Sequence, residues 1–548
     1  MHTCIMSGCI LRSVVAWWRL TKMITMNYIE DLLGYIVTAV GRVVSAILNL
    51  IFYLIYERQR SRVPPITNDI LLQSATSLAK KIRTRELTSE QVVQAFIDRV
   101  EKVNPIINAC IAECYNTALE EAKAVDEILD SGNLDESYSE EKKPFLGVPI
   151  SVKTAFALNG MPFSSGLVSR KNVFADFDAP IVQNAKNCGA IPIVVTNCSE
   201  LCMWWESANN IYGTTKNPYN TARIVGGSSG GEGAILAAGG AVLGIGSDIG
   251  GSIRMPSFFN GIFGHKPSKG IINNEGQFPM CDGKDVDYLT SGPMCRYADD
   301  LESWFNILAG SDISNLKSSG MVDVKKLKFY YMEDDGGCPV VKSLHPELRA
   351  AHRKVVEHIQ SSLGIEVETI NIKEMVHSLQ IWSTLMSARL TGGSSFASLM
   401  GNGVEVNVWL ELLKWTIGCS KHTFPAIGLG IMERFSGNDQ EFNEKMIEMC
   451  DELKEKFQKL LSDDGILLYP THPTPAPYHN QPITMMFNFA YTAIFNVLGL
   501  PATSCPLGLG SDGVPLGIQV IASHANDYNC FAVAREIEKA FGGWVKHI

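Results

Sequence analysis

The sequence lacks the features that mark several large classes of protein. Its 14 cysteines include no C-x-x-C pair and no dense spacing, so neither a disulfide scaffold nor a zinc module is predicted. The net charge is −10 and no long block of Lys and Arg appears, which argues against a nucleic-acid partner. With 46% apolar and 19% charged residues, the 548-residue chain is neither disordered nor fibrous, and it can bury a large core.

Two pairs of cysteines are nevertheless close in sequence, Cys110 with Cys114 and Cys198 with Cys202. Neither pair has a histidine at the spacing that zinc sites use. We therefore expect free thiols in a reducing compartment rather than metal ligands or disulfides.

One segment near the N-terminus differs from the rest of the chain. Residues 33–56 contain a single charge, Arg42, among many Ile, Leu, Val, Phe and Tyr residues. A helix of this length would measure about 36 Å, enough to cross a hydrocarbon core of about 30 Å. We predict a single-pass membrane anchor here. A charge near the bilayer centre costs roughly 2.5–3.5 kcal/mol, so an in-plane amphipathic helix and a buried helix stay open as alternatives.

The charges beside this span predict its orientation. More basic residues follow the span than directly precede it, which places the C-terminal body in the cytoplasm. Residues 1–32 form an N-terminal segment. Met23 and Met26 are both candidate starts, and a start at either would make the stretch before it dispensable. Residues 57–68 are predicted to be a linker.

The chain beyond Pro65 alternates between two hydrophobic patterns. Short apolar runs at 148–152, 191–195 and 466–469 predict buried strands. Thr88-Ser89-Glu90-Gln91 predicts a capped helix start, and residues 346–363 predict a helix that Gly364 ends. This alternation favours an α/β body.

The most informative stretch is residues 226–252, which read GGSSGGEGAILAAGGAVLGIGSDIGGS and hold 11 glycines. Glycine at this density indicates left-handed backbone angles or close approach to a ligand. The phosphate-loop order Gly-x-x-x-x-Gly-Lys-Ser/Thr is absent. The alternative is a turn at 248–252 that aims backbone N–H groups at a developing oxyanion, with Ser252 at its end as a nucleophile.

A serine nucleophile needs a base. His265 is the nearest histidine in sequence, but no acidic residue is recognisably arranged to orient it, so we expect a structural role. Lys153 follows a buried apolar strand, where a charge is costly to hold. Taken alone, such a lysine is more typical of a structural ion pair than of a catalytic base.

Together these motifs resemble the amidase signature family. The matching elements are residues 226–231, 246–254 and 264–267, with Lys153 at the position of the family lysine. The resemblance extends over residues 69–541, which we take as the catalytic domain. It implies an α/β fold in which a large mixed twisted β-sheet is surrounded by α-helices, here preceded by the N-terminal transmembrane helix. The anchor makes the fatty-acid amide hydrolases the most similar branch.

The resemblance implies a Ser–Ser–Lys triad. Ser252 would be the nucleophile, Ser228 the proton shuttle and Lys153 a base that starts neutral. In the family, Ser228 would be reached through a cis Gly227–Ser228 peptide. The other implied residues are the oxyanion-hole donors Ile249, Gly250, Gly251 and Ser252 and the supporting residues Ser229, Asp248 and Arg254.

The implied reaction is hydrolysis of fatty-acid primary amides and N-acylethanolamines through an acyl-enzyme, with neither a metal nor an organic cofactor. The implied partners are the lipid amide, membrane lipids and a second copy of the chain in a homodimer. Apolar residues 404–417 would contact the membrane, or else form an ordinary packed helix. Three other functions stay open: an amidase for small or peptide amides, the glutaminase subunit of a tRNA-dependent amidotransferase, and a catalytically silent membrane scaffold.

Overall fold

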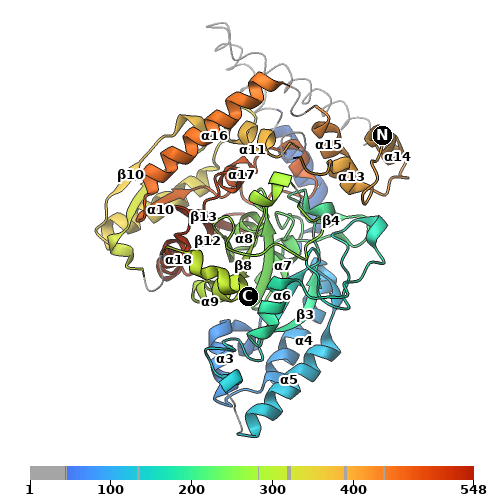
Figure 1. Ribbon diagram of the computed structural model, residues 1–548, viewed down its shortest axis with the longest axis vertical. Coiled ribbons are helices and arrows are strands. Elements are labelled where there is room, and N and C mark those ends of the chain that lie inside the picture. The colour runs from blue at the N-terminus through green and yellow to red at the C-terminus, as the bar shows by residue number, and fades with distance from the viewer. Residues whose placement is uncertain are drawn as a thin grey trace.

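The computed structural model describes residues 44, 46–132, 136–281, 283–317, 322–387, 392–435 and 439–547. An 11-stranded sheet runs through the middle of this part of the chain, in the order β1-β3-β2-β6-β8-β7-β12-β13-β11-β9-β10 (Figure 1). The pairs β2/β3, β2/β6, β9/β10 and β9/β11 are parallel, and the other neighbours are antiparallel. The predicted α/β fold with a large mixed sheet is confirmed.

The strands of the sheet are short, and a separate two-stranded hairpin stands beside them. Their bounds are β1 Cys110–Glu113, β2 Pro149–Lys153, β3 Ile191–Thr196, β4 Ala208–Asn209, β5 Gly213–Thr214, β6 Leu243–Asp248, β7 Phe263–Lys266, β8 Thr290–Cys295, β9 Lys328–Tyr331, β10 Val367–Thr369, β11 Gly465–Tyr469, β12 Ala502–Leu509 and β13 Pro515–Ala522. The helices around the sheet are α3 Ala75–Arg83, α4 Ser89–Ile107, α5 Tyr115–Asp130, α6 Pro180–Asn187, α7 Gly230–Ala237, α8 Arg254–Asn260, α9 Ala298–Ala309, α10 Pro346–Ser362, α11 Ser378–Leu385, α13 Phe396–Met400, α14 Val408–Thr416, α15 Phe424–Glu433, α16 Gln440–Leu461, α17 Ala490–Val497 and α18 Asp527–Phe541.

Local sequence signals place several of these elements to within one residue. The predicted strands 148–152, 191–195 and 466–469 correspond to β2, β3 and β11. Helix α4 begins at the predicted capping box, in which Thr88 accepts from the N–H of Gln91 and the Gln91 side chain accepts from the N–H of Thr88. Helix α10 ends just before Gly364, whose φ of +70° suits a glycine.

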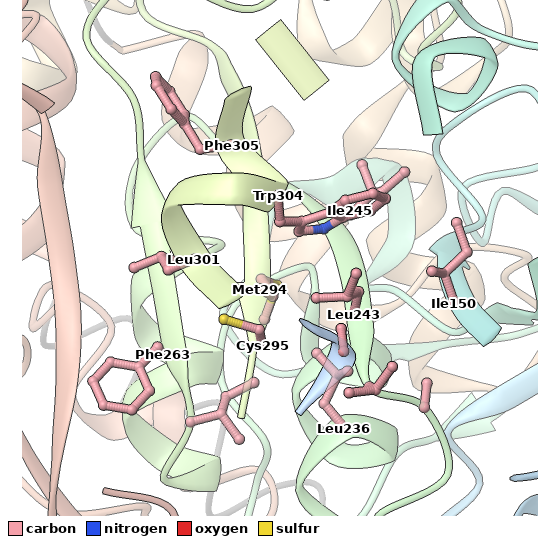
Figure 2. Packing of buried hydrophobic residues seen from close by; sticks show 14 of the residues in the cluster. Ile150, Leu236, Leu243, Ile245, Phe263, Met294, Cys295, Leu301, Trp304 and Phe305 are labelled. Carbon is pink, nitrogen blue, oxygen red and sulfur yellow. The ribbon is translucent and has the colours of Figure 1, made fainter. Parts of the chain in front are cut away.

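The core forms because the central strands are apolar on both faces. Every residue of β2, β3 and β6 is buried, as expected for strands covered on both sides. Figure 2 shows Leu243 and Ile245 of β6 beside Trp304 of α9, whose indole N–H donates to the carbonyl of Gly244 at 2.8 Å. Because side chains alternate along a strand, Gly244 itself faces the other side of the sheet, where α7 packs.

The predicted membrane anchor falls only partly within the structure. Residues 33–43 and 45 lie outside the described residues, and residues 46–56 are helical. Phe52 of this helix packs against Ala222 and Tyr478, whereas Leu50 and Leu54 are more than half exposed. Within the described ranges, no helix combines the length and the apolar character needed to cross a membrane.

The segment predicted as a linker lies against the globular body. Val63 and Ile66 are buried in the main core, and their N–H groups donate to the carbonyls of Pro218 and His547. Burying these apolar side chains stabilises the chain by more than the conformational entropy of a free linker would. Residues 63–66 are therefore held against the globular body.

Candidate active site

The topology of the sheet gathers the predicted catalytic residues at one edge. Strands β2 and β6 are parallel neighbours, so their carboxyl ends lie side by side. Lys153 is the last residue of β2, and Ser252 follows β6 in the turn that leads into α8. Ser228 and Ser229 directly precede α7, which packs across the same strands.

Lys153 is buried completely and surrounded by hydroxyl groups. Its Nζ donates to Ser228 Oγ at 2.8 Å, to Ser247 Oγ at 2.9 Å and to Ser229 Oγ at 3.0 Å. Among the described residues, no carboxylate forms an ion pair with this ammonium group. Sequence reasoning missed Ser247, because its place beside Lys153 depends on the register between β2 and β6.

Ser228 connects the lysine with Ser252. While its hydroxyl accepts from Lys153, its backbone N–H donates to Ser252 Oγ at 2.9 Å. The expected cis Gly227–Ser228 peptide is not observed: among the described residues the one cis peptide is Phe278–Pro279. Here Gly226 and Gly227 instead adopt positive φ angles, +79° and +54°, and this turn brings Ser228 to the lysine.

The turn 249–252 has its peptide groups fixed from both sides. Trp382 Nε1 donates to the carbonyl of Ile249 at 2.9 Å, and Thr492 Oγ1 donates to that of Gly250 at 2.7 Å. In a trans peptide the N–H points away from the carbonyl, so these two contacts orient the N–H groups of Gly250 and Gly251. Trp382 and Thr492 come from α11 and α17, far away in sequence, and no local sequence pattern predicts that they lie at this turn.

The N–H of Gly251 is directed at a carboxylate rather than at open space. Asp248 Oδ1 accepts from it at 2.7 Å, and Asp248 Oδ2 accepts from the N–H of Ile253 at 3.0 Å. Of the four predicted oxyanion donors, Ile249, Gly250 and Ser252 stay predictions, while Gly251 serves to hold the turn.

Asp248 and Arg254 form an ion pair in which neither side chain is exposed. Arg254 Nη2 donates to Asp248 Oδ1 at 2.9 Å and Nε to Oδ2 at 3.1 Å. Burial works to raise the pKa of Asp248, but the charge of Arg254 and the hydrogen bonds that the carboxylate accepts lower it to about 2. Arg254 also donates to Gln519 and Asn496, so the pair ties the turn to β13 and α17.

His265 lies in the core, away from the three serines around Lys153. Its ring nitrogens contact Thr503 Oγ1 at 2.7 Å and Asp527 Oδ1 at 3.0 Å, and its ring packs on Phe305 and Phe531. Every one of these groups is buried, which fits the structural role expected of it.

Cys202 is a neighbour of the site that sequence reasoning did not place there. A hydrogen bond with Cys198 lowers the pKa of the Cys202 thiol against the effect of burial, and the charge of Lys153 and hydrogen bonds to Ser165 and Ser228 act in the same direction. Both cysteines are free thiols. Within the described ranges, no cluster of three His, Cys, Asp or Glu side chains could hold a metal ion.

Helix α14 has a packed side and an exposed apolar side. Leu412 and Trp415 pack into a cluster with α13 and α15, which lie together with α14 in Figure 1. On the other side Leu410, Leu413 and Ile417 are 48%, 61% and 69% exposed. The packed-helix interpretation of residues 404–417 thus describes one side of α14, and contact with a membrane stays a prediction for the exposed side.

Comparisons with known proteins identify a family, sequence relatives and a shared fold. The sequence model of the amidase family matches residues 91–531. The chain is 49% identical over 516 residues to fatty-acid amide hydrolase 2-A of Danio rerio, covering 92% of this chain and 96% of that protein. It is 48% identical over 518 residues to fatty-acid amide hydrolase 2 of Homo sapiens, with 94% and 96% covered. A solved structure of a fatty acid amide hydrolase has a TM-score of 0.68 at 23% identity, with 87% of this chain and 86% of that chain covered, and it shows the shared fold.

Replacing Asp248 by Asn should destabilise the protein strongly. The change leaves Arg254 buried without its counter-charge, which costs about 3–5 kcal/mol of the free energy of unfolding. Because the folded-state pKa of Asp248 is depressed to about 2 from 3.8, the stabilisation is present above about pH 4 and is lost as the pH falls toward 2. Urea unfolding between pH 7 and pH 3 measures this. The difference in the free energy of unfolding between wild type and Asp248→Asn should become smaller as the pH falls.

Asp451→Asn is the matched control, because Asp451 forms an exposed ion pair with Lys454. It should leave the free energy of unfolding nearly unchanged. Equal effects of the two substitutions would contradict a special role for the buried pair.

Proposed function

The chain belongs to the amidase signature family of amide-hydrolysing enzymes, and we propose that it cleaves fatty-acid amides at a membrane through Lys153, Ser228 and Ser252. The observation that carries this proposal is the contact set of Lys153. A buried amino group touches three serine hydroxyls, and one of these serines also donates its N–H to Ser252 Oγ. The relatives that the chain matches at 48–49% identity are named fatty-acid amide hydrolases, which supports the substrate class.

In the proposed mechanism a proton moves along one short relay. Neutral Lys153 takes the proton of Ser228, which takes the proton of Ser252 as its Oγ forms a bond to the amide carbonyl carbon. Ser228 then gives that proton to the leaving nitrogen while the C–N bond breaks, and it takes a proton back from Lys153, which becomes neutral again. Water attacks the resulting ester, releases the fatty acid and restores the Ser252 hydroxyl.

The negative charge that develops on the carbonyl oxygen needs fixed donors. The N–H groups of Ile249, Gly250 and Ser252 are the candidates, and Trp382 and Thr492 support the turn that carries them. A preorganised donor of this kind contributes about 2.7–4 kcal/mol to the transition state. Asp248 and Arg254 act by keeping the turn in place.

Two apolar surfaces support the membrane part of the proposal. One is the helix at 46–56, which we propose to be the end of a single-pass anchor over residues 33–56, with the catalytic domain on the cytoplasmic side. The other is the exposed side of α14. The cluster under α14 includes Leu201, which directly precedes Cys202, a neighbour of Ser228, so apolar packing connects this helix with the surroundings of the site. The homodimer that the family resemblance implies stays a prediction.

Ser252→Ala should abolish covalent labelling by a fluorophosphonate, because it removes the attacking oxygen. Ser228→Ala should still label, about 10²–10⁴-fold more slowly, because the nucleophile is present without its proton shuttle. Ser361→Ala, an exposed hydroxyl on α10, should label like wild type. Gel fluorescence with time-resolved labelling measures all three. Undiminished labelling of Ser252→Ala would contradict the assignment.

The substrate class is tested with amides of increasing chain length. Each buried methylene contributes about 0.8 kcal/mol, so kcat/KM for a long-chain primary amide should exceed that for acetamide at least about 100-fold. A preference for short or peptide amides would favour the small-amide amidase instead.

Replacing Leu410, Leu413 and Ile417 together by Ser should impair the use of substrate held in a membrane. The exposed apolar side of α14 would lose its contact with lipid, so KM for a long-chain amide in phosphatidylcholine vesicles should rise about tenfold. Hydrolysis of a water-soluble short amide should stay unchanged. Leu509→Ser, which alters an exposed leucine on β12, is the control and should change neither rate. Equal losses on both substrates in the triple variant would contradict a membrane role for α14.

A further inference from the structure

A buried carboxyl group lies beside Lys153, and the mechanism above does not use it. Glu232 is in the first turn of α7, a helix whose eight residues are all buried. Its Oε2 accepts from Ser151 Oγ at 2.5 Å, and its Oε1 accepts from Thr196 Oγ1 at 2.7 Å. In the part of the chain that the structure describes, no cation forms an ion pair with this carboxyl group.

The two hydroxyls that hold Glu232 flank Lys153 in the sheet. Ser151 is two residues before Lys153 on β2, so both side chains leave the same face. Thr196 is the residue of β3 that pairs with Lys153. On the next strand, a Cβ at Gly244 would lie 2.1 Å from Glu232 Oε2, so the carboxyl occupies the space that this glycine leaves open. The carboxyl group therefore lies next to the base of the Lys153 side chain, across β3, β2 and β6.

The charges of Glu232 and Lys153 act on one another because both side chains are out of water. Burial raises the pKa of Glu232 to about 7, against the hydrogen bonds from Ser151 and Thr196 and the charge of Lys153, which lower it. The carboxyl group thus changes charge in the neutral range. The three groups that Lys153 Nζ contacts directly are uncharged hydroxyls. The charge of Glu232 therefore acts on Lys153 with little screening.

We propose that Glu232 is a positioning residue that sets the charge state of Lys153. As a carboxylate it favours the ammonium form of Lys153, so the lysine loses its proton and can act as the base only at a higher pH than it would beside an uncharged group. This inference rests on the proposed function, because it assigns a control to the same proton relay.

Within the described ranges, three thiols are the other titratable groups that interact with this pair. Cys110 of β1 faces Glu232, and Cys198 and Cys202 face Lys153. Burial raises the pKa of Cys110 and of Cys198 well above the ordinary range, so both stay uncharged. Cys202 is the one that can carry a second negative charge, and the experiment has to separate it from Glu232.

The test is the pH dependence of acylation by a fluorophosphonate, measured on the full chain in detergent. Wild type should accelerate with rising pH, and Lys153→Met should lose this rise. Glu232→Gln keeps the shape and removes the charge; its amide oxygen still accepts from one of the two hydroxyls, and its NH2 group donates to the other. Without the negative charge of Glu232, Lys153 loses its proton at a lower pH. The midpoint of the rise in the acylation rate should therefore move to lower pH by at least about one unit.

Glu206→Gln is the matched control, because Glu206 is also buried but is paired with His479. It should leave the midpoint where it is. In a Cys202→Ser background the shift caused by Glu232→Gln should persist. If the shift vanishes there, the Cys202 thiolate is the controlling charge and the inference is wrong.

The outcomes also separate this inference from the proposed function. If Lys153→Met keeps the wild-type profile, the lysine is not the base and the proposed function fails. If Lys153→Met loses the rise but folded Glu232→Gln keeps the wild-type midpoint, only the role of Glu232 is overturned. Should Glu232→Gln not fold, Ser151→Ala serves instead. It removes a hydrogen bond that favours the carboxylate, so the midpoint should again move to lower pH, and an unchanged midpoint would overturn the inference.

Discussion

The burial of Lys153 among serine hydroxyls is the constraint on which the rest of the site depends. A charged amino group is costly to hold out of water, and here its direct partners are three neutral oxygens. Such an environment suits a group that gives up and takes back a proton. It also fixes where the neighbours must lie: Ser247 on the adjacent parallel strand, and Ser228 and Ser229 at the start of α7, which packs on the same face.

The turn that follows β6 is held in place by a second buried interaction. Asp248 and Arg254 neutralise each other without exposure, and the carboxylate also binds the N–H groups of the turn. Trp382 and Thr492 hold the carbonyls from the opposite side. A backbone held from both sides cannot rearrange when charge develops on a substrate, and this preorganisation is what an oxyanion site requires. Arg254 thus fixes the backbone of the turn, whereas the role proposed for Lys153 is to move a proton.

Local sequence signals were sufficient for elements whose pattern is contained in a few residues. The apolar runs located β2, β3 and β11, and the Thr88 capping box located the start of α4. The glycine-rich motif singled out Ser252. Only the family resemblance pointed to Ser228 and made Lys153 more than a structural lysine. Ser247, Trp382 and Thr492 could not be found this way, because strand register and long-range packing bring them to the site. The direction of the Gly251 N–H toward Asp248 and the docking of Val63 and Ile66 on the core likewise depend on tertiary contacts.

A crystal structure of the enzyme after reaction with a long-chain fluorophosphonate tests the central claim most directly. The account predicts a covalent bond from phosphorus to Ser252 Oγ, with a phosphoryl oxygen facing the N–H groups of the turn 249–252. Lys153 should still be hydrogen-bonded to Ser228. The alkyl chain should run toward the cluster beneath α14. A bond to Ser228 or to Cys202, or a Lys153 that has left the serine hydroxyls, would contradict the account.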